Sequence, residues 1–200
     1  MLWWPKRHST ATIERVVAGF PVDLAADVYL VLQALPIAKH EPTVDCIEAR
    51  VSGESLRVPY RVYFPLPSAR ALERLGDRQR HILAALLTRH HDGYVREAWV
   101  GEVLSSPASW APAFVVPLLG EYVAELAHAV LRGMPTRREA YAAFAAENRE
   151  LCRKISARMI NYWALYYRRA APRFSDYPGY QAARALGVWQ ERPPRERHAR

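Results

Sequence analysis

The stretch LRVPYRVYF, residues 56–64, places an apolar side chain at nearly every second position. This period of two is typical of a strand with one buried face. Residues 47–51 alternate in the same way, and the polar sequence SGES at 52–55 lies between the two stretches as a turn. The sequence therefore predicts a β-hairpin over about residues 44–64. Because Pro59 has no amide hydrogen, its strand belongs at the edge of a sheet or at a bulge.

The rest of the chain indicates helices, which must cover the hairpin because two strands alone are only marginally stable in water. A helix over 110–132 contains Pro117, which should kink or split it. A longer helix is expected over about 137–169, opened by a capping box of Thr136 and Glu139. At ~1.5 Å per residue, such a helix would be a rod of ~50 Å, either the spine of the fold or the seam of a homodimer.

We therefore expect a mainly α fold of packed helical hairpins with one small β-hairpin. The domain should cover residues 1–190, and the charged tail at 191–200 should be disordered. The chain has 200 residues, of which 50% are hydrophobic and 24% charged, as is typical of one globular domain. This composition excludes disorder of the whole chain, and the presence of only Cys46 and Cys152 excludes a disulfide scaffold.

The formal net charge is +8, and the C-terminal half carries most of the excess. Such a charge favours anionic partners, namely nucleic acid, an anionic membrane surface or an acidic protein. The basic residues are nearly all Arg, however, and the chain is also rich in Ala, a combination typical of GC-rich coding sequence. The charge is also scattered, whereas nucleic-acid binding predicts a clustered stripe.

The N-terminus lacks the apolar segment of a secretory signal, and no run of about 18 apolar residues could span a bilayer. The two cysteines are then most simply reduced thiols. We expect a cytoplasmic protein.

Residues 78–105 resemble one helical repeat of the HEAT type, with an Asp in the turn and Val-Arg at the start of the second helix. The resemblance implies that Asp92 caps that helix and that Arg96 pairs with a neighbouring unit. It also implies packed helical hairpins and protein binding. The pair His91-Asp92 is similar to the metal-binding segment of HD-domain phosphohydrolases, but the further ligands of that family are missing. The chain as a whole resembles uncharacterised bacterial proteins, which implies no activity.

Glu121, Glu125 and His128 are spaced i, i+4 and i+7, so one helix would place them on one face. Glu125 and His128 also form half of the signature of di-iron bundles. The sequence has no second Glu-x-x-His, so we expect no metal and no cofactor.

Glu121 directly follows an apolar run, where a buried carboxylate would need a partner. Arg96, or Arg57 and Arg61 on the predicted strand, are the candidate partners. We expect a Glu–Arg or a Glu–His network to join the 90–97 turn to the 121–128 helix. The candidate binding network consists of His91, Asp92, Arg96, Glu121, Glu125 and His128.

Residues 161–169, NYWALYYRR, combine aromatic side chains with a basic pair. At helical spacing Tyr162 and Tyr166 continue the core stripe of the long helix. The surplus residues Trp163 and Tyr167, with Arg168 and Arg169, are then a candidate interface. Stacking on unpaired bases is the alternative use, but exposed aromatic residues more often mark protein contacts.

Nucleophile elbows, phosphate-binding loops, dinucleotide fingerprints and Cys-x-x-Cys pairs are all absent from the sequence, which makes an enzyme less favoured. We expect a protein-interaction or regulatory module with a protein partner, in which a homodimer would form through the long helix. The first alternative is an enzyme or ligand-binding protein with a site between the 90–97 turn and the 110–131 helix. The second is nucleic-acid binding through the basic C-terminal half.

Overall fold

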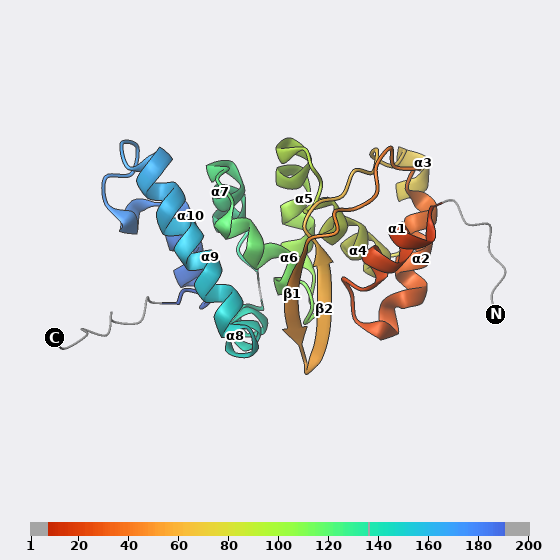
Figure 1. Ribbon diagram of the computed structural model, residues 1–200, viewed down its shortest axis with the longest axis horizontal. Helices are drawn as coiled ribbons and strands as arrows, with labels where there is room; N and C mark the ends of the chain where they lie inside the picture. Colours follow the sequence, from red (N-terminus) through yellow and green to blue (C-terminus); the bar gives the residue numbers. More distant parts are fainter. Residues whose placement is uncertain (1–7, 136, 191–200) are drawn as a thin grey trace.

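The computed structural model describes residues 8–135 and 137–190 (Figure 1). Over these ranges the fold is mainly helical with one two-stranded antiparallel hairpin, as the sequence predicts. The expected cap at Thr136 and the expected disordered tail at 191–200 lie outside the described residues. None of the helices in this part of the chain is both long and apolar enough to cross a membrane.

The described elements follow one another along the chain. They are α1 (Thr10–Val17), η1 (Val22–Leu24), α2 (Ala25–Ala34), β1 (Cys46–Val51), β2 (Glu54–Pro59), α3 (Ala69–Leu72), α4 (Asp77–Leu87), α5 (Gly93–Ser105), α6 (Pro112–Val115), η2 (Val116–Gly120), α7 (Ala124–Arg132), α8 (Arg138–Glu147), α9 (Arg149–Tyr162), the π-helix η3 (Trp163–Tyr167), η4 (Phe174–Asp176) and α10 (Pro178–Ala185).

The hairpin lies between two groups of helices, with α1, α2 and α4 on one side and α8 and α9 on the other (Figure 1). Strand β1 pairs with β2 so that Ile47 lies opposite Val58. Ser52 and Gly53 form the turn, with φ values of 53° and 84°. Two consecutive positive φ angles are typical of the tight turn that matches the twist of a hairpin. The apolar residues of the alternating stretches, among them Val58, enter the core as predicted.

The expected helix over 110–132 is split, as the position of Pro117 predicts. Helix α6 passes into the 3-10 turn η2, which contains Pro117, and the chain becomes extended at Glu121 with a ψ of 156°. Helix α7 then begins at Ala124. This interruption places Glu121 outside the helix that carries Glu125 and His128.

The prediction of one continuous helix over about 137–169 is wrong, because the chain bends at Asn148 between α8 and α9 (Figure 1). Asn148 has φ −122° and ψ 39°, outside the helical region. Its side-chain amide binds the backbone of Arg50, at 2.7 Å for both the N–H and the C=O group. The tertiary contact with β1 therefore outweighs the helical periodicity. The single long helix through which a homodimer was expected to form is therefore replaced by two shorter helices.

Candidate functional site

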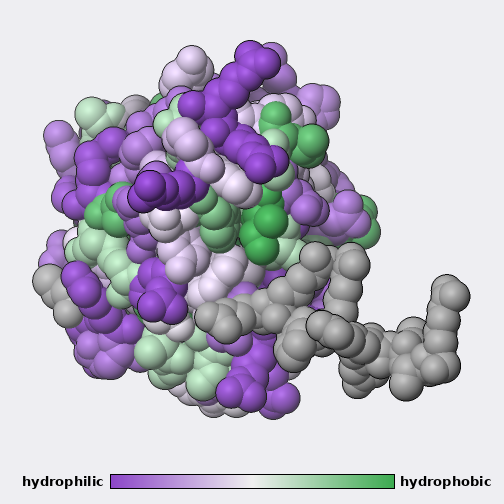
Figure 2. Space-filling view, turned by 90° about the vertical axis from the view of Figure 1, so that its left-hand side faces the viewer, coloured by the Kyte–Doolittle hydropathy of each residue, from purple (hydrophilic) through white to green (hydrophobic). Residues whose placement is uncertain are grey.

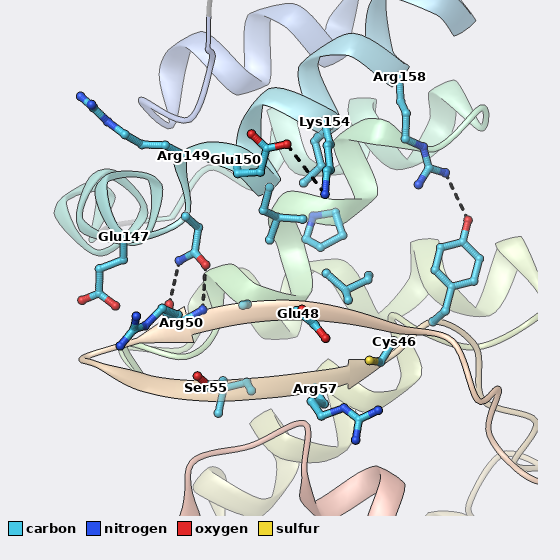
Figure 3. A pocket seen from close by; sticks show the side chains of 18 of the residues that line it. Cys46, Glu48, Arg50, Ser55, Arg57, Glu147, Arg149, Glu150, Lys154 and Arg158 are labelled. Carbon is cyan, nitrogen blue, oxygen red and sulfur yellow. Dashed lines mark hydrogen bonds and ion pairs between the residues drawn. The ribbon is translucent and has the colours of Figure 1, made fainter.

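Glu121 lies at the centre of a buried cluster of three arginines. Its Oε1 accepts a hydrogen bond from Arg89 Nη2 at 2.7 Å. Its Oε2 lies 3.1 Å from Arg61 Nη2 and 3.0 Å from Arg96 Nη2. The predicted contact of Glu121 with an arginine is thus present, with both Arg96 and Arg61. Arg57 does not take part, since its exposed side chain lies beside Cys46 and points away from α9 (Figure 3).

Four segments far apart in the sequence supply this arginine cluster, which we define as Arg61, Arg89, Arg96 and Glu121. Arg61 follows β2, Arg89 follows α4, Arg96 lies in the first turn of α5, and Glu121 follows η2. Backbone carbonyls hold two of the guanidinium groups in place. Arg96 Nη1 donates to His90 O at 2.8 Å and to His91 O at 2.9 Å, and Arg61 Nη1 donates to Tyr60 O at 2.8 Å.

The cluster carries two more positive than negative charges in a buried place. The side chains of Arg89, Arg96 and Glu121 are only 1%, 3% and 4% exposed. Burial lowers the pKa of Arg89 to about 10, although the charge of Glu121 acts in the opposite direction. Burial also lowers the pKa of Arg96, and the neighbouring charge of Arg61 adds to this effect. In both groups the loss of hydration on burial outweighs the attraction of the Glu121 carboxylate.

Several N–H groups of the cluster have no acceptor. Within residues 8–135 and 137–190, neither Nε nor Nη1 of Arg89 has a hydrogen-bond partner, and the same holds for Nε of Arg96. Buried donors of a charged group are costly to leave unpaired. The cluster is therefore suited to receive an additional acceptor with a negative charge.

A groove of about 1020 Å³ lies beside this cluster, between the hairpin and helices α8 and α9 (Figure 3). Arg89 and Glu121 form part of its wall, together with Pro117. The remaining lining comes from the two strands and from the two helices. These residues are Cys46, Ile47, Glu48, Ala49, Arg50, Ser55, Leu56, Arg57, Tyr60, Glu147, Asn148, Arg149, Glu150, Leu151, Lys154, Ile155, Ala157 and Arg158.

The free edge of β1 faces this groove. In an antiparallel pair, successive residues of a strand direct their backbone groups alternately to the partner strand and away from it. Asp45 accepts from Tyr60 N on the partner side, whereas the N–H and C=O of Arg50 bind Asn148 on the opposite side. Glu48 is two residues from Arg50, so its backbone groups also point away from β2. In the described chain, no hydrogen bond to these groups of Glu48 on the groove side is present.

A second contact crosses from the hairpin to α9 near the other end of β1 (Figure 3). The hydroxyl of Tyr60, the residue after β2, accepts a hydrogen bond from Arg158 Nη2 at 3.2 Å. Burial alone would raise the pKa of Tyr60, but this hydrogen bond and the charge of Arg158 lower it overall. The guanidinium of Arg61 lies 4.5 Å from the centre of the Tyr60 ring, which connects this contact to the arginine cluster.

Of the expected network, only Arg96 and Glu121 meet through their side chains, at 3.0 Å, while His91 contributes its backbone carbonyl to Arg96. Asp92 caps α5 by accepting from Tyr94 N at 2.9 Å, the role that the HEAT resemblance implies for it. His91 stacks on Tyr63 with ring centres 5.2 Å apart. Glu125 and His128 are exposed on α7. The prediction that Glu121 shares one helical face with Glu125 and His128 is wrong, because the backbone is extended at Glu121 and α7 begins only at Ala124.

The aromatic segment that ends α9 is rotated relative to the prediction. Trp163 donates from Nε1 to Ala171 O at 2.8 Å, and Tyr167 accepts from Ala124 N at 3.2 Å, so both serve the packing of the chain. Tyr166, expected in the core, is 64% exposed. The π-helix η3 has more residues per turn than an α-helix, and it displaces the apolar stripe by about one position.

The basic pair next to η3 remains exposed. Arg168 lies over the Trp163 ring at 5.7 Å from its centre. Figure 2 views the molecule from the C-terminal helices, and hydrophobic residues there occupy separate small areas among hydrophilic ones. The interface role of Trp163, Tyr167, Arg168 and Arg169 stays a prediction.

Sequence reasoning missed Arg89 and Asn148, among other residues of the site. Arg89 follows an apolar run that is wholly buried from Ile82 to Leu87, and a charged residue there needs a partner just as Glu121 does. That signal was available. Asn148 has no comparable signal, because its acceptor and donor on Arg50 are 98 positions away.

No group of three or more His, Cys, Asp and Glu side chains suited to a metal ion occurs in the part of the chain that the structure describes. No family model, no curated protein and no solved structure matches the chain.

Proposed function

We propose that the protein is an interaction module that binds an extended peptide segment of a partner protein. The segment lies in the groove and adds as a third strand to β1. The observation that carries this proposal is the backbone of Glu48, which faces the groove and has no hydrogen-bond partner among the residues that the structure describes. Peptides that add to a sheet edge gain affinity from main-chain hydrogen bonds and specificity from alternate side chains.

The two contacts that cross the groove limit the added strand. Asn148 occupies the edge at Arg50, so main-chain pairing is restricted to the stretch from Cys46 to Ala49. The Tyr60–Arg158 contact lies beyond the other end of that stretch. A peptide would thus pair over a few residues only, and its side chains would supply the rest of the affinity. The opposite wall offers both apolar contacts, from Leu151 and Ile155, and charges.

A cytoplasmic location belongs to the same proposal. Cys46 and Cys152 are both free thiols, and burial raises the pKa of Cys152 to about 11, which keeps it protonated. Reduced cysteines are the normal state in the cytoplasm. A bacterial source is likewise part of the proposal.

The test uses two substitutions at one position. A synthetic library of random octapeptides with free carboxyl termini is selected on the full chain, and the enriched peptides are measured by fluorescence polarisation. Glu48→Pro removes an edge N–H without removing a bond to β2, and we expect it to weaken binding about tenfold or more. Glu48→Ala keeps that N–H and removes the same charge, so it should bind within about threefold of the natural chain.

Two results would overturn the proposal. The first is a library selection that enriches no peptide. The second is an enriched peptide that binds Glu48→Pro as tightly as Glu48→Ala. Circular dichroism of both variants checks that the fold is retained.

A further inference from the structure

Resting on the proposed function, we infer that the arginine cluster binds the C-terminal carboxylate of the peptide that adds to β1. Arg89 is the principal donor. The groove then recognises the end of a partner chain, not an internal segment.

The donors for a carboxylate are already in place. Glu121 engages only Nη2 of Arg89, and the Nε and Nη1 groups of that side chain have no acceptor within the described residues. Arg89 is 1% exposed and forms part of the groove wall, but its Nε and Nη1 atoms are themselves buried, so a carboxylate in the groove reaches them once the side chain shifts towards the groove. Charge-assisted hydrogen bonds of guanidinium to carboxylate are among the stronger polar contacts in proteins.

The charge of the site calls for one or two anions. Three guanidinium groups face the single carboxylate of Glu121 at distances between 2.7 and 3.1 Å. A second carboxylate would leave the cluster with one excess positive charge instead of two. Water could hydrate the free donors, but it would leave the charge unchanged.

The position of the arginine cluster, at one end of the groove, favours binding of the end of a peptide. Tyr60 from the hairpin and Arg158 from α9 are joined across the groove just beyond Cys46 (Figure 3). Arg61 touches both the Tyr60 ring and Glu121, so the cluster lies at this same end. A peptide that follows β1 towards Cys46 meets this contact and has to stop there.

The direction of the peptide follows. With its carboxylate near Cys46, the first residue of β1, the peptide runs antiparallel to β1. In an antiparallel pair one residue can exchange both main-chain bonds with its opposite residue. The last peptide residue then lies opposite Cys46, and the third from the end pairs with Glu48.

The experiment compares three forms of one selected octapeptide on the natural chain. The free acid is the reference. The C-terminal amide removes the carboxylate, and we expect it to bind about tenfold or more weakly. The amide with Asp as its last residue restores a carboxylate on a side chain, and we expect it to stay weak.

A variant of the cluster gives the second arm. Arg89→Met leaves Glu121 with two guanidinium partners, and it should bind the acid and the amide equally. An amide that binds the natural chain as tightly as the acid overturns the inference and leaves strand addition standing. Recovery of full affinity by the terminal Asp would assign the cluster to side-chain carboxylates and also overturns it.

If the library yields no peptide, the proposed function fails, and the cluster is tested alone with N-acetylglycine as the probe. Nuclear magnetic resonance of the Arg89 Nε–H group records its binding. A shift of that signal that saturates, absent with N-acetylglycinamide, supports carboxylate recognition without the added strand. Equal spectra with both probes overturn it.

Discussion

The two edges of the hairpin differ, although each strand has six residues and each faces a helical layer. The β2 edge is covered by the chain itself, where Arg57 N donates to Ala18 O at 2.7 Å. A Cβ added to Gly19 would lie only 3.1 Å from Pro59 Cδ on that side. The β1 edge borders a groove of about 1020 Å³ and is paired by Asn148 at Arg50.

We relate the covered β2 edge to the stability of the fold and the β1 edge to the proposed binding of a partner. Open sheet edges expose unpaired backbone groups and invite pairing with another chain, so proteins normally cover them. The β2 edge is covered in that way by a close backbone contact. The β1 edge instead adjoins an arginine cluster that has donors without an acceptor in residues 8–135 and 137–190, and in the proposed function an incoming chain would use both the backbone of this edge and the charge of the cluster.

The largest expected effect concerns the cluster at the open edge. Glu121→Ala leaves Arg89 and Arg96 buried without their carboxylate, and it should lower the free energy of unfolding by about 3–5 kcal/mol. Glu125→Ala, at an exposed position on α7, should change it by less than about 0.5 kcal/mol. Urea titration of both variants measures this. Equal stabilities would mean that Glu121 does not compensate the arginines.

The next prediction contrasts the packing of the two edges. Gly19→Val places side-chain atoms against Pro59 and the backbone of Val16, and it should cost about 1–3 kcal/mol of unfolding free energy. Glu48→Val on the open edge introduces the same side chain where nothing has to move, so its effect should be within about 0.5 kcal/mol. Thermal unfolding of the two variants measures how tightly each edge is packed. A Glu48→Val variant as unstable as Gly19→Val would contradict an open β1 edge.

A smaller effect is expected where Asn148 closes part of β1. Asn148→Ala removes two hydrogen bonds to the Arg50 backbone, which water in the groove can partly replace, and a third to Phe144 O. We expect a loss of about 1 kcal/mol and faster hydrogen exchange at the Arg50 amide. The Arg57 amide on the covered edge serves as the internal control, and its exchange should change only as much as global stability does. An unchanged Arg50 amide would contradict the contact.

The smallest effect concerns the segment that continues β2 towards α4. His90 accepts from Asp92 N through Nδ1 and binds Phe64 O through Nε2, both at 3.0 Å, and burial lowers its pKa. The folded state therefore binds this proton less tightly than the unfolded state, whose pKa is near 6.5. The stability gained from neutral His90 is complete above pH 6.5 and is lost as the pH falls through the lower folded pKa.

Urea unfolding over that acidic range tests this dependence. His90→Gln should show a flatter slope of unfolding free energy against pH than the natural chain does. Identical slopes for His90→Gln and the natural chain would contradict the assignment.

Local sequence patterns predicted the elements whose signals are local. The alternation at residues 56–64 predicted the hairpin, and Pro117 predicted the break between α6 and α7. The position of Glu121 after an apolar run predicted its pairing with an arginine. These features follow from neighbouring residues, because strand period, proline geometry and buried charge act over a few positions.

The remaining features depend on contacts that the sequence does not display. The helical stripe runs through Asn148 without interruption, so only its bonds to Arg50, 98 positions away, reveal the bend. The π-helix after Tyr162 displaced the aromatic stripe and placed Tyr166 on the surface. The groove itself arises from α8, α9 and the hairpin together, and no single segment predicts it.

Amide hydrogen exchange of the hairpin tests the central claim most directly, with and without a selected octapeptide. In the free protein we expect slow exchange at Arg57, whose N–H binds Ala18 O, and fast exchange at Glu48. The bound peptide should slow the hydrogen exchange of the Glu48 amide and leave that of the Arg57 amide unchanged. Slow exchange at Glu48 in the free protein, or fast exchange with the peptide bound, would contradict an open edge that receives a third strand.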